Sequence, residues 1–230
     1  MQLQEPATVI IAVLLGYLVG SIPTAYIVAR WRSGIDIRDY GSRNVGAANV
    51  TQHVGRLHGV FVGGFDILVK GVGPVLVARL VGLELDGQTL VGLAAVIGHN
   101  WSIYLRFSGG RGLTVVLGSL LAVAFKEGAI FFLVGFLGWA LFRNAGLWTG
   151  ISALLLPAWA IIFGEPTTII LYTVVLLGIL IVKRLLSNPE DESLKVNLKE
   201  KLMARLLYDR DTMGKGDWVT RGPHRSERRN

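Results

Sequence analysis

Long apolar stretches separated by short polar connections dominate this chain. They fall at residues 8–29, 59–81, 88–105, 113–125, 128–142, 145–163 and 167–182. A helix rises 1.5 Å per residue, so about 20 apolar residues span the hydrocarbon core of a bilayer. Several of these stretches are shorter. We expect some of their helices to extend into flanking residues or to be partly re-entrant. The pattern predicts an all-α integral membrane protein of about seven transmembrane helices.

The charges on the connections alternate along the chain. Basic residues gather on every second connection, at Arg30, Arg32, Arg38, Arg43, Arg56, Arg106, Arg111 and Arg143. The connections between them carry Glu84 and Asp86, an offsetting Lys126 and Glu127, and Glu165. Basic loops of membrane proteins face the cytoplasm, so we predict that the N-terminus lies outside and the basic C-terminal tail lies in the cytoplasm. That orientation requires an odd number of spans, and seven satisfies it.

Composition agrees with a membrane protein and narrows its chemistry. Hydrophobic residues make up 52% of the 230 residues and charged residues only 17%, which is far from the balance of a soluble domain. Cytoplasmic loops beside anionic lipid explain the net charge of +7, so nucleic acid is not needed as a partner. Cysteine is absent, which excludes disulfides, thiolate nucleophiles and thiolate metal sites. Clustered metal ligands are also missing, and we expect neither a metal nor a cofactor.

The chain divides at about residue 185 into a membrane domain, 1–185, and a cytoplasmic tail, 186–230. In the tail Leu194, Leu198, Leu202 and Leu206 recur every fourth residue among charged residues. This spacing predicts an amphipathic helix, which either lies on the inner membrane surface or caps the helix bundle. The final segment from Gly214 has little to bury, and we expect it to be disordered.

A first candidate site is the loop Tyr-Gly-Ser-Arg-Asn-Val-Gly-Ala-Ala-Asn at residues 40–49. Glycines such as Gly46 let the backbone fold tightly enough for several N–H groups to converge on an anion. Ser42, Asn44 and Asn49 can donate to phosphate oxygens. Arg43 adds a positive charge and a planar guanidinium with parallel N–H donors. The alternative is a polar turn followed by a helix cap.

A second candidate follows the third apolar stretch. His99 and Asn100 precede a turn that runs into the fourth stretch and contains Ser108, Gly109, Gly110, Arg111 and Gly112. A glycine-rich turn at a helix N-terminus offers free N–H groups and the positive end of the helix dipole, which suits phosphate. The pattern matches neither a Walker loop nor a dinucleotide fingerprint, and a tight turn is the alternative. His99 is a candidate base or headgroup ligand, or it only satisfies a backbone carbonyl.

Two charges fall inside the second apolar stretch. Asp66 and Lys70 are four residues apart, so they share a helix face and we expect an ion pair at membrane depth. Either a structural or a substrate-binding role suits such a pair.

Several enzyme classes leave signatures that are missing here. The chain has no His-x-x-x-x-Asp, no Gly-x-Ser-x-Gly elbow and no His-Glu-x-x-His. Without an evident side-chain nucleophile, the chemistry needs an already activated substrate and electrostatic stabilisation by arginines and backbone donors. An acyl phosphate is such a substrate.

Five ordered motifs resemble a known family. Gly20-Ser-Ile-Pro-Thr-Ala-Tyr26, Gly41 to Asn49, Asp66 with Lys70-Gly71, Gly98-His99 and Gly109-Gly-Arg-Gly112 resemble the acyl-phosphate:glycerol-3-phosphate acyltransferases, the PlsY family, over residues 8–185. The resemblance implies a seven-helix protein of the bacterial cell (inner) membrane with a site facing the cytoplasm. It implies acyl transfer from acyl phosphate to the 1-hydroxyl of glycerol 3-phosphate, with release of inorganic phosphate.

The resemblance also assigns roles. Ser42 and Asn44 match the first phosphate-binding loop and Gly109 to Gly112 the second. We therefore expect catalytic roles for Ser42, Arg43 and Arg111. The expected substrate-binding residues are Asn44, Gly46, Asn49, Asp66, Lys70, His99, Asn100, Ser108, Gly109, Gly110 and Gly112. The family view is substrate-assisted, with a phosphate oxygen taking the hydroxyl proton.

Some positions depart from the family pattern. The family has an arginine where Gln52 stands, lysines where Ser108 and Arg111 stand, and one residue fewer between the acid and base of the Asp66–Lys70 pair. Its His-Arg-x-Asn-Ile motif is replaced by residues 178–186. A second hypothesis is therefore a non-catalytic or altered-substrate paralogue that binds a phosphorylated lipid precursor, and a third is a small membrane transporter.

Overall fold

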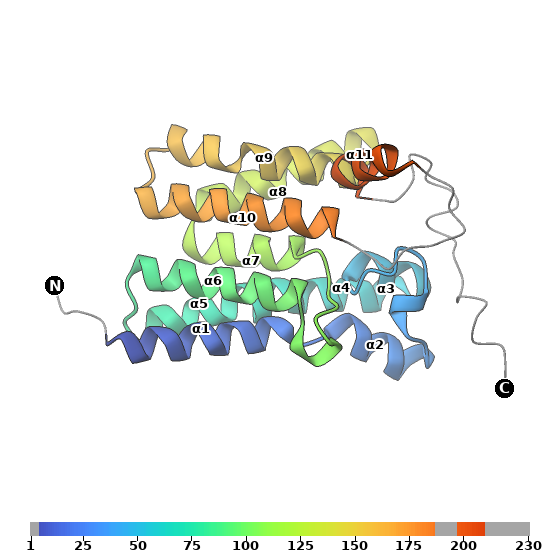
Figure 1. Ribbon diagram of the computed structural model, residues 1–230, viewed down its shortest axis with the longest axis horizontal. Coiled ribbons are helices and arrows are strands. Elements are labelled where there is room, and N and C mark those ends of the chain that lie inside the picture. Colours follow the sequence, from blue (N-terminus) through green and yellow to red (C-terminus); the bar gives the residue numbers. More distant parts are fainter. Residues whose placement is uncertain (1–4, 187–196, 210–230) are drawn as a thin grey trace.

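The computed structural model describes residues 5–186 and 197–209, and every regular element within those ranges is a helix. Long helices run side by side along the long axis of the molecule, while the short helices α2, α3 and α11 gather at one end, on the right in Figure 1. The predicted all-α architecture is confirmed.

The first apolar stretch forms two helices rather than one. α1 (Pro6–Ser21) and α2 (Thr24–Ser33) are separated by Ile22 and Pro23. Proline cannot donate a backbone hydrogen bond and disfavours helical geometry in the residue before it, and Ile22 accordingly has a ψ of 119°. The expected uninterrupted helix over 8–29 is wrong for this reason.

The second stretch is continuous but irregular. It contains α4 (Arg56–Phe65), the π-helical segment η2 (Asp66–Val72) and α5 (Gly73–Leu80). A π-turn holds one more residue than an α-turn, so it absorbs the additional residue between Asp66 and Lys70. The two side chains still meet, and the predicted ion pair is confirmed at 2.7 Å.

The remaining stretches each contain one long helix. These are α6 (Leu85–Asn100), α7 (Leu113–Val123), α8 (Phe125–Phe142), α9 (Ala145–Ile162) and α10 (Thr167–Leu185). The short elements are η1 (Ile37–Asp39), α3 (Ala47–His53), η3 (Ile103–Leu105) and α11 (Leu198–Tyr208). The helix expected over 88–105 ends at Asn100, because residues 101–112 form the loop that carries η3 and the glycine-rich turn.

Within residues 5–186 and 197–209, five helical segments are long and apolar enough to cross a membrane: Pro6–Ser33, Arg56–Leu80, Phe125–Phe142, Ala145–Ile162 and Thr167–Leu185. α6 and α7 have 16 and 11 residues, shorter than the roughly 20 that a full span needs. The count of seven spans stays a prediction.

Small residues let the central helices approach closely. A Cβ atom placed on Gly20 of α1 would lie 2.1 Å from the carbonyl oxygen of Ala95 in α6. α7 packs on η2 in the same way, because a Cβ on Gly118 would lie 2.1 Å from the carbonyl oxygen of Ile67. Such contacts are typical of helices packed within a membrane, where lipid removes the hydrophobic drive between them.

The two ends of the bundle differ in their polar contacts. At one end Lys126 pairs with Glu165 at 2.8 Å, and Thr168 Oγ1 donates to Asp86 at 2.5 Å. The glycine-rich loops and α11 lie at the opposite end (Figure 1). The alternating charges of the sequence therefore separate into two ends of one structure.

The tail helix α11 packs against the bundle at this second end. Arg184 Nη1 donates to the carbonyl oxygen of Leu206, and Arg205 Nη1 donates to that of Leu185, each at 2.7 Å. The leucine spacing allowed a helix on the inner membrane surface or a helix that caps the bundle. These contacts fit a helix that caps the bundle. Leu194 and the segment from Gly214 lie outside the described residues, and the division into two domains stays a prediction.

Candidate active site

The first glycine-rich loop is tied together by Asn49. Its amide Nδ2 donates to the carbonyl oxygens of Ile37, Tyr40 and Asn44 at 3.1, 3.0 and 3.1 Å. The residue is 3% exposed, and its Oδ1 has no hydrogen-bond partner among the described residues. Asn49 is thus mainly the brace that shapes the loop.

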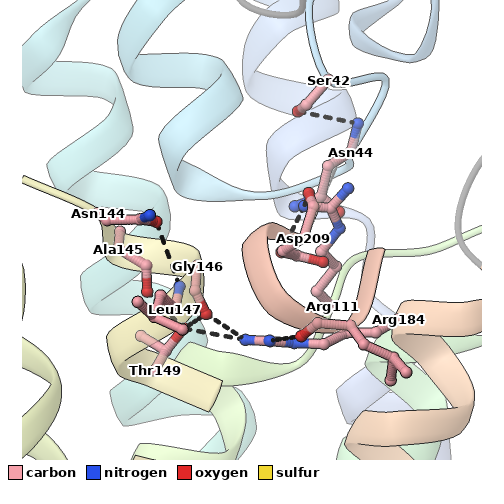
Figure 2. Close-up of polar contacts among 11 residues, drawn as sticks. Ser42, Asn44, Arg111, Asn144, Ala145, Gly146, Leu147, Thr149, Arg184 and Asp209 are labelled. Carbon is pink, nitrogen blue, oxygen red and sulfur yellow. Dashed lines mark hydrogen bonds and ion pairs between the residues drawn. The ribbon is translucent and has the colours of Figure 1, made fainter. Parts of the chain in front are cut away.

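The loop's tip presents the other predicted side chains. The Asn44 N–H donates to Ser42 Oγ at 3.4 Å, and Arg43 between them has a left-handed φ of 56°. Gly46 precedes the first residue of α3. Figure 2 shows Ser42 beside Asn44, and these two residues line one cavity with Arg111.

The second glycine-rich loop lies directly on His99 and Asn100. The Gly110 N–H donates to the carbonyl oxygen of His99 at 3.0 Å. A Cβ on Gly110 would lie 2.1 Å from His99 Nε2, and one on Gly112, whose φ is 76°, would lie 2.5 Å from Asn100 Oδ1. His99 and Asn100 therefore form the floor on which only a glycine-rich turn fits.

The buried pair lies behind that floor. Asp66 and Lys70 side chains are 1% and 3% exposed, and Lys70 Nζ is 3.4 Å from His99 Nδ1. Thr114 Oγ1, from the first turn of α7, donates to Asp66 Oδ2 at 3.4 Å. These contacts hold His99 and α7 in place and suit a positioning role.

Two cavities open between the loops. The larger, 530 Å³, is lined among others by Ser42, Asn44, Gly46, Asn49, Gln52, His99, Arg111 and Gly112. The smaller, 350 Å³, is lined among others by Arg38, Arg43, Asn44, Ser108, Gly109, Arg111 and Lys183. Asn44 and Arg111 line both. The structure thus brings the two predicted loops together, whereas Asp66, Lys70, Asn100 and Gly110 line neither cavity.

Arg111 is held by the tail helix. Its Nη1 donates to the carbonyl oxygen of Asp209 at 2.6 Å and pairs with the Asp209 carboxylate (Figure 2). The two side chains are 11% and 10% exposed. Asp209 lies at the end of α11, so a residue of the tail reaches the second loop.

A wall of the larger cavity comes from the start of α9, which sequence reasoning missed. Asn144 Oδ1 accepts from the Leu147 N–H at 3.3 Å and caps this helix. Arg184 Nη2 donates to the carbonyl oxygen of Gly146 at 2.8 Å and to Thr149 Oγ1 at 3.1 Å (Figure 2). The basic Arg143 in this short connection was the only signal available in the sequence.

Lys183 is a second residue that sequence reasoning missed. It lies in the last turn of α10, is 7% exposed and lines the smaller cavity. It comes from residues 178–186, the segment that replaces the family's His-Arg-x-Asn-Ile motif. A cation at the end of an apolar stretch was its signal, although such lysines commonly extend to the membrane surface.

An ion pair just before the first loop adds charge at the edge of the smaller cavity. Arg38 Nη2 lies 2.6 Å from Asp36 Oδ2, and Arg38 Nε donates to Asp36 Oδ1 at 2.9 Å. These hydrogen bonds hold the pKa of the Asp36 carboxyl below its ordinary value of 3.8. Asp36 therefore stays ionised and keeps Arg38 oriented.

The polar groups around the site suit phosphate. Within the described ranges, no three His, Cys, Asp or Glu side chains come together as a group that could hold a metal ion. Arginine, lysine, hydroxyl and amide groups line the two cavities, and these are donors to phosphate oxygens.

Known proteins share this chain's sequence and fold. The profile of the family described as "Glycerol-3-phosphate acyltransferase" matches residues 10–191. "Glycerol-3-phosphate acyltransferase 4" of Dehalococcoides mccartyi (strain CBDB1) is 40% identical over 212 residues, covering 90% of each chain. "Glycerol-3-phosphate acyltransferase 2" of Moorella thermoacetica is 40% identical over 190 residues, covering 79% of this chain and 95% of its own.

A solved structure supports the same relationship. The glycerol 3-phosphate form of PlsY (YgiH), described as an integral membrane glycerol 3-phosphate acyltransferase, superposes with a TM-score of 0.72 at 31% identity. The match covers 76% of this chain and 88% of that one. The fold, the ordered loops and these relatives agree, and the chain belongs to the glycerol-3-phosphate acyltransferase family.

Proposed function

We propose that this protein transfers a fatty acyl group from acyl phosphate to the 1-hydroxyl of glycerol 3-phosphate in phospholipid synthesis. The products are lysophosphatidic acid and inorganic phosphate. Relatives carry the name glycerol-3-phosphate acyltransferase, and related structures are described as glycerol 3-phosphate and lysophosphatidic acid forms. The observation that carries the proposal is the place of Arg111, which lines both cavities between the two glycine-rich loops.

The reaction needs no protein nucleophile. The hydroxyl oxygen of glycerol 3-phosphate attacks the acyl carbonyl carbon and forms the new ester bond. The bond between that carbon and the phosphate oxygen breaks, and the phosphate leaves with the electron pair. The hydroxyl proton passes to a phosphate oxygen, so the substrate itself acts as the base. The protein's task is to hold two phosphate groups and stabilise the charge on the carbonyl oxygen.

Different residues are suited to hold a phosphate group in each of the two cavities. Arg111 can bind a phosphate group in either cavity because it lines both. Arg43 and Lys183 line the smaller cavity and can bind a phosphate group there. Ser42 and the Asn44 amide serve the larger one. Charge-assisted hydrogen bonds of this kind contribute about 1.5–3 kcal/mol each, enough to orient both substrates.

We further propose seven spans with the N-terminus outside and the site facing the cytoplasm of a bacterial cell (inner) membrane. α6 and α7 would complete the seven spans, tightly packed within the bundle. The basic residues Arg43, Arg111 and Arg143 meet at the loop end, which suits the cytoplasmic side. Cysteine accessibility tests this orientation, because the chain has no native cysteine.

An acyl-transfer assay tests the function. Purified protein in detergent receives acyl phosphate and glycerol 3-phosphate, and mass spectrometry follows lysophosphatidic acid. We expect product from the native chain and at least about a hundredfold less from Arg111→Ala, because two phosphate contacts are lost. Lys126→Ala at the opposite end is the matched control. No product from the native chain would refute the assignment, and equal product from all three proteins would refute the role of Arg111.

One observation favours the alternative of a binding paralogue. Gln52 lines the larger cavity as an uncharged amide where the family has an arginine. Calorimetry that shows glycerol 3-phosphate binding without any turnover would support this alternative over catalysis.

A further inference from the structure

The contact between Arg111 and Asp209 joins residues 98 positions apart. Asp209 accepts through both its main-chain carbonyl and its carboxylate, and both bonds come from the same nitrogen, Arg111 Nη1. The position of Arg111 is therefore set by α11.

Asp209 leaves the rest of the guanidinium free. Arg111 Nε and Nη2 are buried and have no hydrogen-bond partner among the described residues. These two nitrogens form the side edge of the guanidinium, whose parallel N–H groups match two oxygens of one phosphate. Buried donors without an acceptor are costly, so this edge is suited to an anionic ligand.

The residue that carries this edge lines the larger cavity. Arg111, Asp209 and Tyr208 line the 530 Å³ cavity together with Ser42 and Asn44. Figure 2 shows Asp209 beside Arg111, with Ser42 and Asn44 on the neighbouring loop. A phosphate on this edge would therefore also lie near the first glycine-rich loop.

We infer that Asp209 is a positioning residue for substrate binding. It holds Nη1 of Arg111 so that the Nε–Nη2 edge faces a substrate phosphate, and α11 is thereby part of the active site. A lysine at position 111 has one ammonium group, which cannot present a second, oriented edge while it binds Asp209. The inference deepens the proposed function and rests on it.

Docking of α11 is independent of this contact. Arg184 and Arg205 hold the helix through the carbonyl oxygens of Leu206 and Leu185. Asp209→Ala therefore leaves α11 its other contacts, and the variant separates positioning of Arg111 from attachment of the helix. Glu200→Ala removes an exposed acid from the same helix and is the matched control.

Kinetics on these variants form the first arm of the test. For Asp209→Ala we expect a rise of about tenfold in the KM of the phosphate substrate that binds Arg111, with a smaller change in kcat. Separate KM values for glycerol 3-phosphate and acyl phosphate identify that substrate. Asp209→Asn should recover part of the loss, because its carbonyl oxygens still accept from Nη1, and Glu200→Ala should match the native protein.

The second arm is a double-variant comparison. In an Arg111→Ala background, Asp209→Ala should cause no additional loss, since there is no guanidinium left to orient. A full additional loss in that background, or native KM values for Asp209→Ala, would overturn the inference.

Binding without turnover separates the two proposals. Calorimetry with inorganic phosphate reports the Arg111 site whether or not acyl transfer occurs. Weaker phosphate binding by Asp209→Ala in a protein that makes no product would sustain the positioning role and refute the acyltransferase proposal. Unchanged phosphate binding and KM values for Asp209→Ala in an active enzyme would refute the positioning role and sustain the acyltransferase proposal.

Discussion

Lys183 Nζ lies 2.5 Å from the carbonyl oxygen of Asn100, so the end of α10 is joined to the end of α6 beneath the second glycine-rich loop. The ammonium group also lies 5.2 Å from the ring centroid of Trp101. No carboxylate within the described ranges lies at ion-pair distance from it. A buried cation held by a carbonyl and an aromatic ring retains the capacity to attract an anion.

Replacing this cation should weaken phosphate binding. For Lys183→Met, which keeps an unbranched side chain only slightly shorter than lysine, we expect the KM for one phosphate substrate to rise about 10- to 100-fold, the value of one charge-assisted hydrogen bond. Lys183→Arg should keep part of the affinity. Steady-state kinetics with each substrate varied in turn measures both effects.

The matched control for this change is Lys126→Met. Lys126 is an exposed lysine at the opposite end of the bundle, paired with Glu165. If both methionine variants raise KM equally, the effect belongs to net charge or folding and not to the cavity.

Gly110 should be intolerant of any side chain. Gly110→Ala would place a Cβ 2.1 Å from His99 Nε2, so the loop or the imidazole must move. We expect a loss of about 1–3 kcal/mol in stability and a sharp fall in activity. Thermal unfolding in detergent and the acyl-transfer assay measure these.

Gly178 supplies the comparison for Gly110. A Cβ there meets nothing within 4 Å, so Gly178→Ala should change stability by less than about 1 kcal/mol. A Gly110→Ala protein that behaves like Gly178→Ala would contradict the tight packing of the second loop on His99.

Replacing Asp66 alone should destabilise the protein more than replacing Asp66 and Lys70 together. Asp66→Asn leaves Lys70 as a buried cation and should cost about 3–5 kcal/mol, whereas Asp66→Asn combined with Lys70→Met should recover much of that loss. Thermal unfolding of both variants checks this. A double variant less stable than Asp66→Asn would show that the pair acts by other means.

Asp36 should make stability depend on pH on the acid side. Because Arg38 lowers the pKa of Asp36 in the folded protein, the pair stabilises fully only well above the ordinary carboxyl pKa of 3.8, where the carboxyl is ionised in both states. This contribution is lost as the pH falls through the folded-state pKa. The difference in melting temperature between the native protein and Asp36→Asn should therefore shrink below pH 4.

The control for the acid-side effect is Glu84→Gln in the connection between α5 and α6. Its difference from the native protein should not follow the same pH course. A difference between native and Asp36→Asn that is constant from pH 3 to pH 7 would contradict the role of the Asp36–Arg38 pair.

The sequence alone determined the helical class, the family and the two loops. Apolar stretches long enough for a bilayer and glycines among phosphate donors are local patterns, readable without knowledge of what lies nearby. The Asp66–Lys70 ion pair also followed from spacing within one helix. The break at Ile22–Pro23 was equally local, although the apolar content of the stretch concealed it.

Only the tertiary structure decided how the site is assembled. Arg111, Lys183 and Asp209 come from a loop, the end of α10 and the end of α11, and nothing in their local sequence records that they converge. The roles of Asn49 and His99 could not be predicted from local sequence either. The Asn49 amide donates to carbonyl oxygens of its own loop, and the His99 ring packs against the second glycine-rich loop. Side-chain roles depend on neighbours distant in the chain, and those neighbours are set by packing, which local periodicity does not encode.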